Sequence, residues 1–334
     1  MIIDAHAHMY HETYLQWLET EGGIQGRARA RRLQEGIKRR PHTTNVSLRL
    51  EQLDRNGIDF QVVTPPAGGA ISGFDDNPLA TAMVINDGMA RLMEESKGRL
   101  IAGAAVPLTA FEQGGIKEMD RAIKRLGLKA VTVPSHLEGR PPDVLESFWS
   151  QAARMDVPVY IHPVSPEKHI DRPYEGEYDL SRNFGWPFET MLSLSRLVFS
   201  GIMERYPTLK VVGHHLGGGI PFFWGRTNES YDLTNPAHSS VNEVIGRGLS
   251  KPLFDYFSLF YYDTAIGGSA AATRCACEVF GTDRLIFATD APNGPGSGEV
   301  RLATYPGIIR SLDLSEQDTD KILAGNARRM LGLR

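Results

Sequence analysis

Cysteine is scarce in this sequence, which limits the ways in which the chain can be stabilised. Only two cysteines occur among the 334 residues, Cys275 and Cys277, and they lie in an alanine-rich stretch typical of a helix. Two positions apart, they are poorly placed to form a disulfide bond with each other. We therefore expect a reduced chain that folds around a hydrophobic core and works in the cytoplasm.

Long apolar runs and an excess of one charge are absent as well. No stretch approaches the ~20 apolar residues of a membrane span, and the sequence opens on strand-like residues rather than on a targeting peptide. The formal net charge is −4 and the pI about 6.2, so the charge gives no reason to expect nucleic-acid binding. We expect a small-molecule ligand and neither a nucleic-acid nor a membrane partner.

Glycine-rich phosphate-binding motifs are also missing. A doubly wound dinucleotide-binding sheet would need G-x-G-x-x-G after its first strand, and none occurs there. The glycine-rich run at 294–298 lacks the lysine and hydroxyl residue of a phosphate-binding loop. We interpret this run as a turn-rich loop.

Short β-branched segments alternate with helical segments along most of the chain. We predict strands at 1–8, 60–64, 100–106, 129–133, 157–161, 209–212, 261–264 and 284–289. Helices, or loops leading to helices, separate them, and long helices are predicted over 77–97 and 187–206. Eight such units predict a (β/α)8 TIM barrel of the α/β class, as one domain over residues 1–334.

Residues 9–48 break this regularity and contain a basic segment. Its basic residues are Arg27, Arg29, Arg31, Arg32, Lys38, Arg39 and Arg40. One reading is a solvated helical excursion. The other is a helical lid inserted after strand one, whose arginines attract an anionic substrate. In that reading Arg39 and Arg40 are the best candidates, because they lie beside Pro41, where the chain turns.

Histidines gather at the ends of predicted strands, where a TIM barrel carries its active site. Five of the ten histidines lie at such ends: His6, His8, His162, His214 and His215. His6 and His8 lie two positions apart on a strand and therefore project to the same side. Asp290 ends the eighth strand. Imidazoles with one carboxylate are typical ligands of zinc or manganese, so we predict a divalent metal site.

Four segments, in order, resemble the amidohydrolase superfamily. They are DAHAH at 4–8, IHP at 161–163, GHHLGGGIPFFWGR at 213–226 and LIFATDAP at 285–292. They are most similar to the branch that contains 2-amino-3-carboxymuconate-6-semialdehyde, γ-resorcylate and 5-carboxyvanillate decarboxylases. The resemblance covers essentially the whole chain and is weakest over residues 9–48. It implies that His6, His8, His162 and Asp290 bind the metal, with zinc favoured and manganese as the alternative.

The resemblance also implies roles for residues after strand six. In the family, the catalytic histidine lies six residues before a proline and eleven before an arginine, a spacing that matches His215, Pro221 and Arg226. Leu216 stands where the family usually has glycine. Because adjacent strand residues face opposite sides, His214 is expected to face the helix layer or a backbone partner.

Arg226 would take the role of the family arginine that binds a substrate carboxylate, sometimes in a neighbouring subunit. The apolar run Pro221-Phe222-Phe223-Trp224 is unusual for the surface of a monomer, so we expect a homodimer. The aromatic residues near this run could instead line a pocket or pack in the core. They are Trp186, Phe188, Phe222, Phe223 and Trp224.

Three functions remain open on this sequence. We favour metal-dependent, non-oxidative decarboxylation of an aromatic or unsaturated carboxylic acid, with Asp290 transferring the proton and His215 stabilising the developing charge. The same site could hydrolyse a lactone, amide or C–C bond, or add water to an unsaturated acid. A binding protein with a vestigial site is disfavoured by the intact ligand set. The segments at 9–48, 67–76 and 164–186 are expected to set the specificity.

Overall fold

The computed structural model describes residues 1–333 except 66–76, 138–141, 165–176 and 232–247. The predicted specificity loop at 67–76 therefore lies outside the described residues, and so does most of the one at 164–186. The strands are β1 (Ile3–His8), β2 (Phe60–Thr64), β3 (Leu100–Ala105), β4 (Ala130–Pro134), β5 (Val159–His162), β6 (Val211–Gly213), β7 (Tyr261–Asp263) and β8 (Leu285–Ile286).

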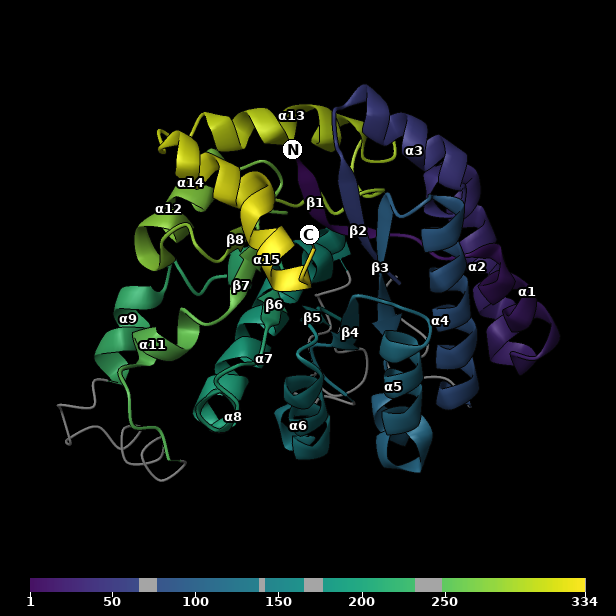
Figure 1. Ribbon diagram of the computed structural model, residues 1–334, viewed down its shortest axis with the longest axis horizontal. Coiled ribbons are helices and arrows are strands. Elements are labelled where there is room, and N and C mark those ends of the chain that lie inside the picture. The colour runs from purple at the N-terminus through teal and green to yellow at the C-terminus, as the bar shows by residue number, and fades with distance from the viewer. Residues whose placement is uncertain (66–76, 138–141, 165–176, 232–247, 334) are drawn as a thin grey trace.

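All eight strands are parallel and follow one another in sequence order, β1 to β8. Backbone hydrogen bonds close the sheet between its two ends. Ala5 N donates to Phe287 O at 2.7 Å, and His8 N donates to Ala291 O at 2.7 Å. The predicted (β/α)8 barrel is confirmed (Figure 1).

Helices surround the strands (Figure 1). They are α1 (Glu12–Thr20), α2 (Gly23–Arg39), α3 (Val46–Arg55), α4 (Pro78–Glu95), α5 (Ile116–Lys124), α6 (Glu146–Met155), α7 (Trp186–Phe199), α8 (Ile202–Arg205), α9 (Trp224–Ser230), α11 (Leu253–Phe257), α12 (Ala270–Phe280), α13 (Glu299–Arg310), α14 (Glu316–Asp320) and α15 (Asn326–Leu331). The helix predicted over 187–206 is divided in two, because Gly201 has a φ of 79° in the left-handed region. No helix in the described ranges is long and apolar enough to cross a membrane.

Two helices, α1 and α2, lie between β1 and α3, in the region of the predicted lid. They pack against each other, and α1 also packs on α4 (Figure 1). Most of the basic side chains of α2 are exposed. The helical insertion is therefore present, whereas its action as a lid, and the treatment of residues 1–334 as one domain, stay predictions.

Candidate active site

Three histidines at the ends of β1 and β5 meet in the interior of the barrel. The Nε2 atoms of His6 and His8 lie 3.2 Å apart, and those of His8 and His162 also lie 3.2 Å apart. All three side chains are buried, and their ligand atoms fall within 4.8 Å of one another. Asp290 joins them through its Oδ1, which lies 3.2 Å from His8 Nε2. The structure thus brings together the four predicted metal ligands.

The other ring nitrogen of each histidine faces a hydrogen-bond acceptor. His8 Nδ1 lies 3.3 Å from Thr64 O, and His162 Nδ1 lies 2.8 Å from Pro163 O. His6 Nδ1 lies 3.0 Å from Asp263 Oδ2. These acceptors favour a proton on Nδ1 and leave the Nε2 lone pairs directed at one another. Burial lowers the pKa of His6 and holds the pKa of His162 well below its ordinary value, so these two rings are neutral near pH 7.

The donor set fits a divalent cation. Ligands about 2.0 to 2.1 Å from a zinc ion in a tetrahedron would be roughly 3.3 to 3.4 Å apart. The three closest contacts among the four residues are 3.2 Å. Facing lone pairs at this distance repel one another unless a cation lies between them. His6, His8, His162 and Asp290 would therefore hold the ion.

Asp290 is an ionised carboxylate with two further partners. Arg301 Nη1 lies 3.1 Å from its Oδ2, and Asn293 Nδ2 donates to its Oδ1 at 3.0 Å. Although burial raises the pKa of Asp290, its contact with His8 and the nearby imidazoles hold it below its ordinary value. The carboxylate is thus available both as a metal ligand and as a proton acceptor.

The glycine-rich run at 294–298 makes room for the arginine beside Asp290. A Cβ atom on Gly294 would come within 2.5 Å of Arg301 Nε, and Gly294 also has a φ of 91°. Only glycine allows this backbone conformation and this close approach at little cost. The run therefore helps Arg301 reach Asp290, a role that its sequence did not suggest.

His214 lies inside the histidine cluster, and the prediction that it faces the helix layer is wrong. Its ring centroid is 3.8 Å from that of His6 and 5.2 Å from that of His162, and the residue is fully buried. Alternation itself holds through His214, because Val212 packs with Tyr160 inside the barrel and His214 keeps an extended backbone, with φ of −69° and ψ of 156°. The prediction failed because the spacing to Pro221 and Arg226 was used to choose His215 as the inward residue. His215 and Leu216 have φ values of 56° and 54°, so regular strand geometry does not continue through them.

His215 lies next to this cluster and is less buried than His214. The two ring centroids are 6.0 Å apart. Burial lowers the pKa of His215 and lowers that of His214 to about 4. Both rings are therefore neutral near pH 7. The geometry does not favour His215 over His214 as the catalytic histidine.

Asp263, at the end of β7, is a site residue that the sequence analysis missed. Its Oδ2 lies 2.5 Å from His214 Nδ1 and 3.0 Å from His6 Nδ1, and its Oδ1 accepts from His215 N at 2.9 Å. Burial raises the pKa of Asp263, but His214 and His6 outweigh this and hold it well below its ordinary value. A carboxylate at the end of the seventh strand was the signal that could have revealed it.

A cavity of about 230 Å³ opens beside His8. The described residues that line it are His8, Tyr10, Arg32, Leu33, Gly36, Arg39, Arg40, Thr43, Pro292 and Asn293. Arg40 Nη1 donates to Asn293 Oδ1 at 2.6 Å, which holds the arginine against the cavity wall. No carboxylate occurs among these described residues, so the cavity is suited to an anion.

Arg49 connects the turn after α2 to the strand that carries His8. The residue is fully buried, and its Nε and Nη2 donate to His42 O at 3.2 and 3.0 Å. Nη2 also donates to His8 O at 3.3 Å, and Nη1 donates to Gln61 Oε1 at 3.3 Å. Burial lowers the pKa of Arg49 to about 10, so the guanidinium is still charged at neutral pH.

Arg226 lies apart from the cavity beside His8. It is exposed on α9 and is not among the described residues that line the cavity. Two residues before α9, Phe222 is 79% exposed, and the adjacent Phe223 is 45% exposed. The predicted carboxylate-binding arginine therefore lies next to an aromatic surface of the same chain.

The other aromatic residues near this run have different surroundings. The ring centroid of Trp186 is 6.2 Å from that of His162, which places Trp186 at the metal cluster. Trp224 packs against the rings of Phe254, Phe257 and Phe280 in the helix layer. Trp186 thus lies beside a predicted metal ligand, whereas Trp224 packs in the helix layer.

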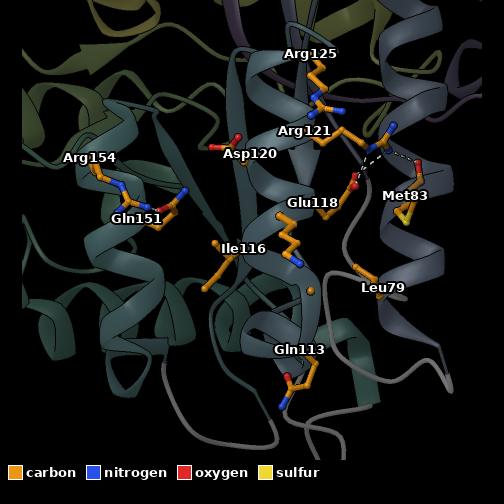
Figure 2. Close-up of a pocket in the computed structure, with 12 residues that line it drawn as sticks. Leu79, Met83, Gln113, Ile116, Glu118, Asp120, Arg121, Arg125, Gln151 and Arg154 are labelled. Carbon is orange, nitrogen blue, oxygen red and sulfur yellow. Dashed lines mark hydrogen bonds and ion pairs between the residues drawn. The ribbon is translucent and has the colours of Figure 1, made fainter.

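A larger cavity, of about 640 Å³, lies between α4, α5 and α6 on the outside of the barrel (Figure 2). Arg121 points across it toward Glu118 and is also paired with Asp87, at 2.7 Å in each case. The described wall also carries the cationic groups of Lys117, Arg125 and Arg154 and the carboxylate of Asp120. None of the predicted site residues lines it, and it does not explain the histidine cluster.

Comparisons with known proteins agree with this geometry. The amidohydrolase family profile matches residues 3–333. The chain is 27% identical over 291 residues to 2-amino-3-carboxymuconate-6-semialdehyde decarboxylase of Dictyostelium discoideum, covering 86% of this chain and 76% of that protein. It is 27% identical over 305 residues to a gamma-resorcylate decarboxylase of Polaromonas sp. strain JS666, covering 85% and 86%.

Solved structures share the fold over nearly the whole chain. The 5-carboxyvanillate decarboxylase of Sphingomonas paucimobilis superposes with a TM-score of 0.79 at 24% identity, covering 100% of this chain and 99% of that one. A dihydroxybenzoic acid decarboxylase of Polaromonas, with bound manganese and the inhibitor 2-nitroresorcinol, gives a TM-score of 0.79 at 23% identity, covering 99% and 97%.

Proposed function

The chain belongs to the amidohydrolase family, and from that premise we propose that it is a metal-dependent, non-oxidative decarboxylase of an aromatic or unsaturated carboxylic acid. The observation that carries the proposal is the meeting of three buried imidazoles and one carboxylate beside an arginine-lined cavity. The decarboxylase names of its relatives favour this reaction over hydrolysis on the same site.

The reaction consumes one proton and releases carbon dioxide. The carbon that bears the carboxylate is protonated, the C–C bond then breaks, and its electron pair returns to the unsaturated system of the substrate. When bound, the divalent ion supplies a Lewis acid that holds the substrate carboxylate and a neighbouring oxygen. Asp290 takes up the proton and delivers it to the carbon, while Arg301 keeps its Oδ2 in place at 3.1 Å.

Two histidines are candidates for stabilising the charge that develops on the substrate. His214 has its Nδ1 fixed by Asp263 and its buried Nε2 without a hydrogen-bond partner among the described residues. The family spacing indicates His215 instead. Its buried Nδ1 also lacks a hydrogen-bond partner among the described residues. We favour His214, because a carboxylate sets its tautomer and orientation, and we keep His215 as the alternative.

Arginines supply the recognition of an anionic substrate. Arg40 lies in the cavity wall at a position set by Asn293, and Arg39 and Arg32 line the same cavity. A guanidinium binds a carboxylate through two parallel hydrogen bonds. The basic segment after β1 then acts as a lid that contributes these groups to the substrate.

Arg226 contributes to a second copy of this chain in a homodimer. Its exposure, beside the exposed Phe222 and Phe223, supports an aromatic interface that carries the arginine into the partner's site. An apolar cavity of about 210 Å³, lined in part by Phe188 and Ile220, lies nearby and offers a place for a side chain of the partner. Sedimentation that shows a monomer at micromolar concentration would contradict this arrangement.

Zinc is the first candidate for the metal, and manganese is the second. Neutral imidazole and carboxylate ligands suit both ions, and a manganese ion is bound in the Polaromonas relative. Elemental analysis of protein purified without chelator should show near-stoichiometric metal.

The two cysteines are free, as a reducing compartment would leave them, and we propose a cytoplasmic location.

The decisive experiment is a screen of phenolic and muconate-type carboxylates with detection of released carbon dioxide. Turnover should stop after chelation and return with zinc or manganese. Cleavage of a lactone, amide or C–C bond without release of carbon dioxide would instead establish the hydrolase alternative. Addition of water to the acid without release of carbon dioxide would establish the hydratase alternative. No turnover of any acid by metal-loaded protein would contradict the decarboxylase proposal.

A further inference from the structure

Asn293 joins two parts of the site that lie far apart in the sequence. Its Oδ1 accepts from Arg40 Nη1 at 2.6 Å across 253 positions, and its Nδ2 donates to Asp290 Oδ1 at 3.0 Å. That carboxylate oxygen is also the atom 3.2 Å from His8 Nε2. One side-chain amide therefore contacts both the arginine of the cavity and a residue of the metal cluster.

The chemistry of this bridge needs an amide. A guanidinium only donates hydrogen bonds and an ionised carboxylate only accepts them, so a side chain between the two must offer one acceptor and one donor. Aspartate at position 293 would lose the donor and place a second negative charge beside Asp290. Leucine, which has a similar shape, would lose both hydrogen bonds.

The backbone fixes the origin of the bridging side chain. Asn293 N donates to Asp290 O at 3.0 Å, which closes the turn after β8. Asn293 also lines the cavity beside His8 together with Arg40. Because the turn holds its Cα, the amide defines where the guanidinium lies along the cavity wall.

We propose that Asn293 is a positioning residue that sets Arg40 for binding of an anion and directs Asp290 Oδ1 toward the metal ligands. The identity of the anion as the substrate rests on the proposed function, whereas the bridge rests on the two hydrogen bonds. The carboxylate-binding arginine and the carboxylate ligand are then linked through a single side chain, so removing that side chain damages both properties.

A double-mutant cycle on binding tests the half of the proposal that concerns Arg40. The affinity of manganese-loaded protein for benzoate, an inert carboxylate, is measured by calorimetry for wild type, Asn293→Leu, Arg40→Met and the double variant. Asn293→Leu should weaken binding by about 5- to 10-fold in the wild-type background and by less than about 2-fold in the Arg40→Met background. A merely structural role would give the same loss in both backgrounds.

Competition with a chelator tests the half that concerns Asp290. Release of manganese from Asn293→Leu should be about 10-fold faster than from wild type, because partners of metal ligands typically contribute about 10- to 100-fold to metal affinity. Asn56→Leu is the matched control. Asn56 donates to Gln52 O and Glu299 Oε1 outside the cavity, and its replacement should change neither measurement.

Several results would overturn the proposal. They are an equal loss of benzoate affinity in both backgrounds, no loss in either, no binding of benzoate by wild type, or unchanged release of metal. If Asn293→Leu does not fold, Asn293→Ser replaces it in both experiments, since a hydroxyl is too short to span both partners. Benzoate binding requires no turnover, so a protein that releases no carbon dioxide from any acid would refute the proposed function while leaving the cycle decisive.

Discussion

The metal ligands and the arginines proposed to bind the substrate are held in different ways. His6, His8 and His162 lie on strands and are buried, with each δ-nitrogen facing an acceptor. By contrast, Arg39 and Arg226 lie on the exposed surface of helices, and Arg40 is held by the hydrogen bond that it donates to Asn293. The barrel therefore fixes the chemistry, while surface helices and turns supply the recognition.

This difference predicts two classes of damage. A substitution among the strand residues should abolish turnover, because an ion needs all its ligands at once. A substitution among the arginines should weaken binding while leaving the rate at saturation nearly unchanged. Mixed effects are expected only where a residue contacts both groups.

The largest effect is expected for His8→Ala. His8 Nε2 is 3.2 Å from both neighbouring imidazoles and the Asp290 carboxylate, so the variant should lose its metal and lose more activity than the ~100-fold typical of an outer partner. Elemental analysis and the rate of carbon dioxide release measure this. His11→Ala is the control, because His11 pairs with Glu95 outside the cluster. A His8→Ala protein that keeps metal and turnover would refute the ligand assignment.

The second-largest effect is expected at one of the two adjacent histidines, His214 and His215. His214→Asn should lower kcat by about 10²- to 10⁴-fold, because the Asp263-bound ring is gone. His215→Asn should lower it by less than about 10-fold. Metal content measured on both variants shows whether a lower kcat reflects a slower chemical step or a loss of bound metal. If His215→Asn is the inactive protein and His214→Asn is not, the spacing to Pro221 and Arg226 identifies the catalytic residue better than the buried geometry does.

A smaller effect, confined to binding, is expected for Arg40→Met. Loss of a charged contact to the substrate carboxylate should raise KM by about 10- to 100-fold and change kcat by less than about 3-fold. Steady-state kinetics on the acid found in the screen provides the measurement. Arg31→Met is the control, since Arg31 is exposed on α2, the helix that ends directly before Arg40, and is not among the described residues that line the cavity. Equal effects of the two substitutions would show that only the overall charge of α2 matters.

The smallest effect on turnover is expected for Arg49, which contacts the backbone of both regions. Arg49→Met leaves the buried carbonyls of His8 and His42 without this donor, and the free energy of unfolding should fall by about 1 to 3 kcal/mol. Arg49→Lys should recover part of that loss. Urea titration of both variants, with Arg55→Met as an exposed control on α3, tests this. If KM is unchanged in Arg49→Met, Arg49 does not influence the position of Arg40.

The meeting of the predicted metal ligands could be anticipated, because local pattern specifies direction on a strand. His6 and His8 alternate on β1, His162 ends β5, and Asp290 lies in the loop after β8. The inward direction of His214 also follows from alternation, since Val212 packs inside the barrel and His214 keeps an extended backbone. The prediction for His214 failed because the spacing to Pro221 and Arg226, rather than the strand, was used to choose the inward histidine.

The sequence by itself determined the barrel, because the alternation of short apolar strands with amphipathic helices is a local property of the chain. It also determined which strand ends carry imidazoles. Only the tertiary structure decided the partners of these groups. Asp263 meets His214 across 49 positions, and Arg40 meets Asn293 across 253. Contacts at such separations follow from the closure of the barrel and the packing of α2 against the turn after β8, which no local pattern encodes.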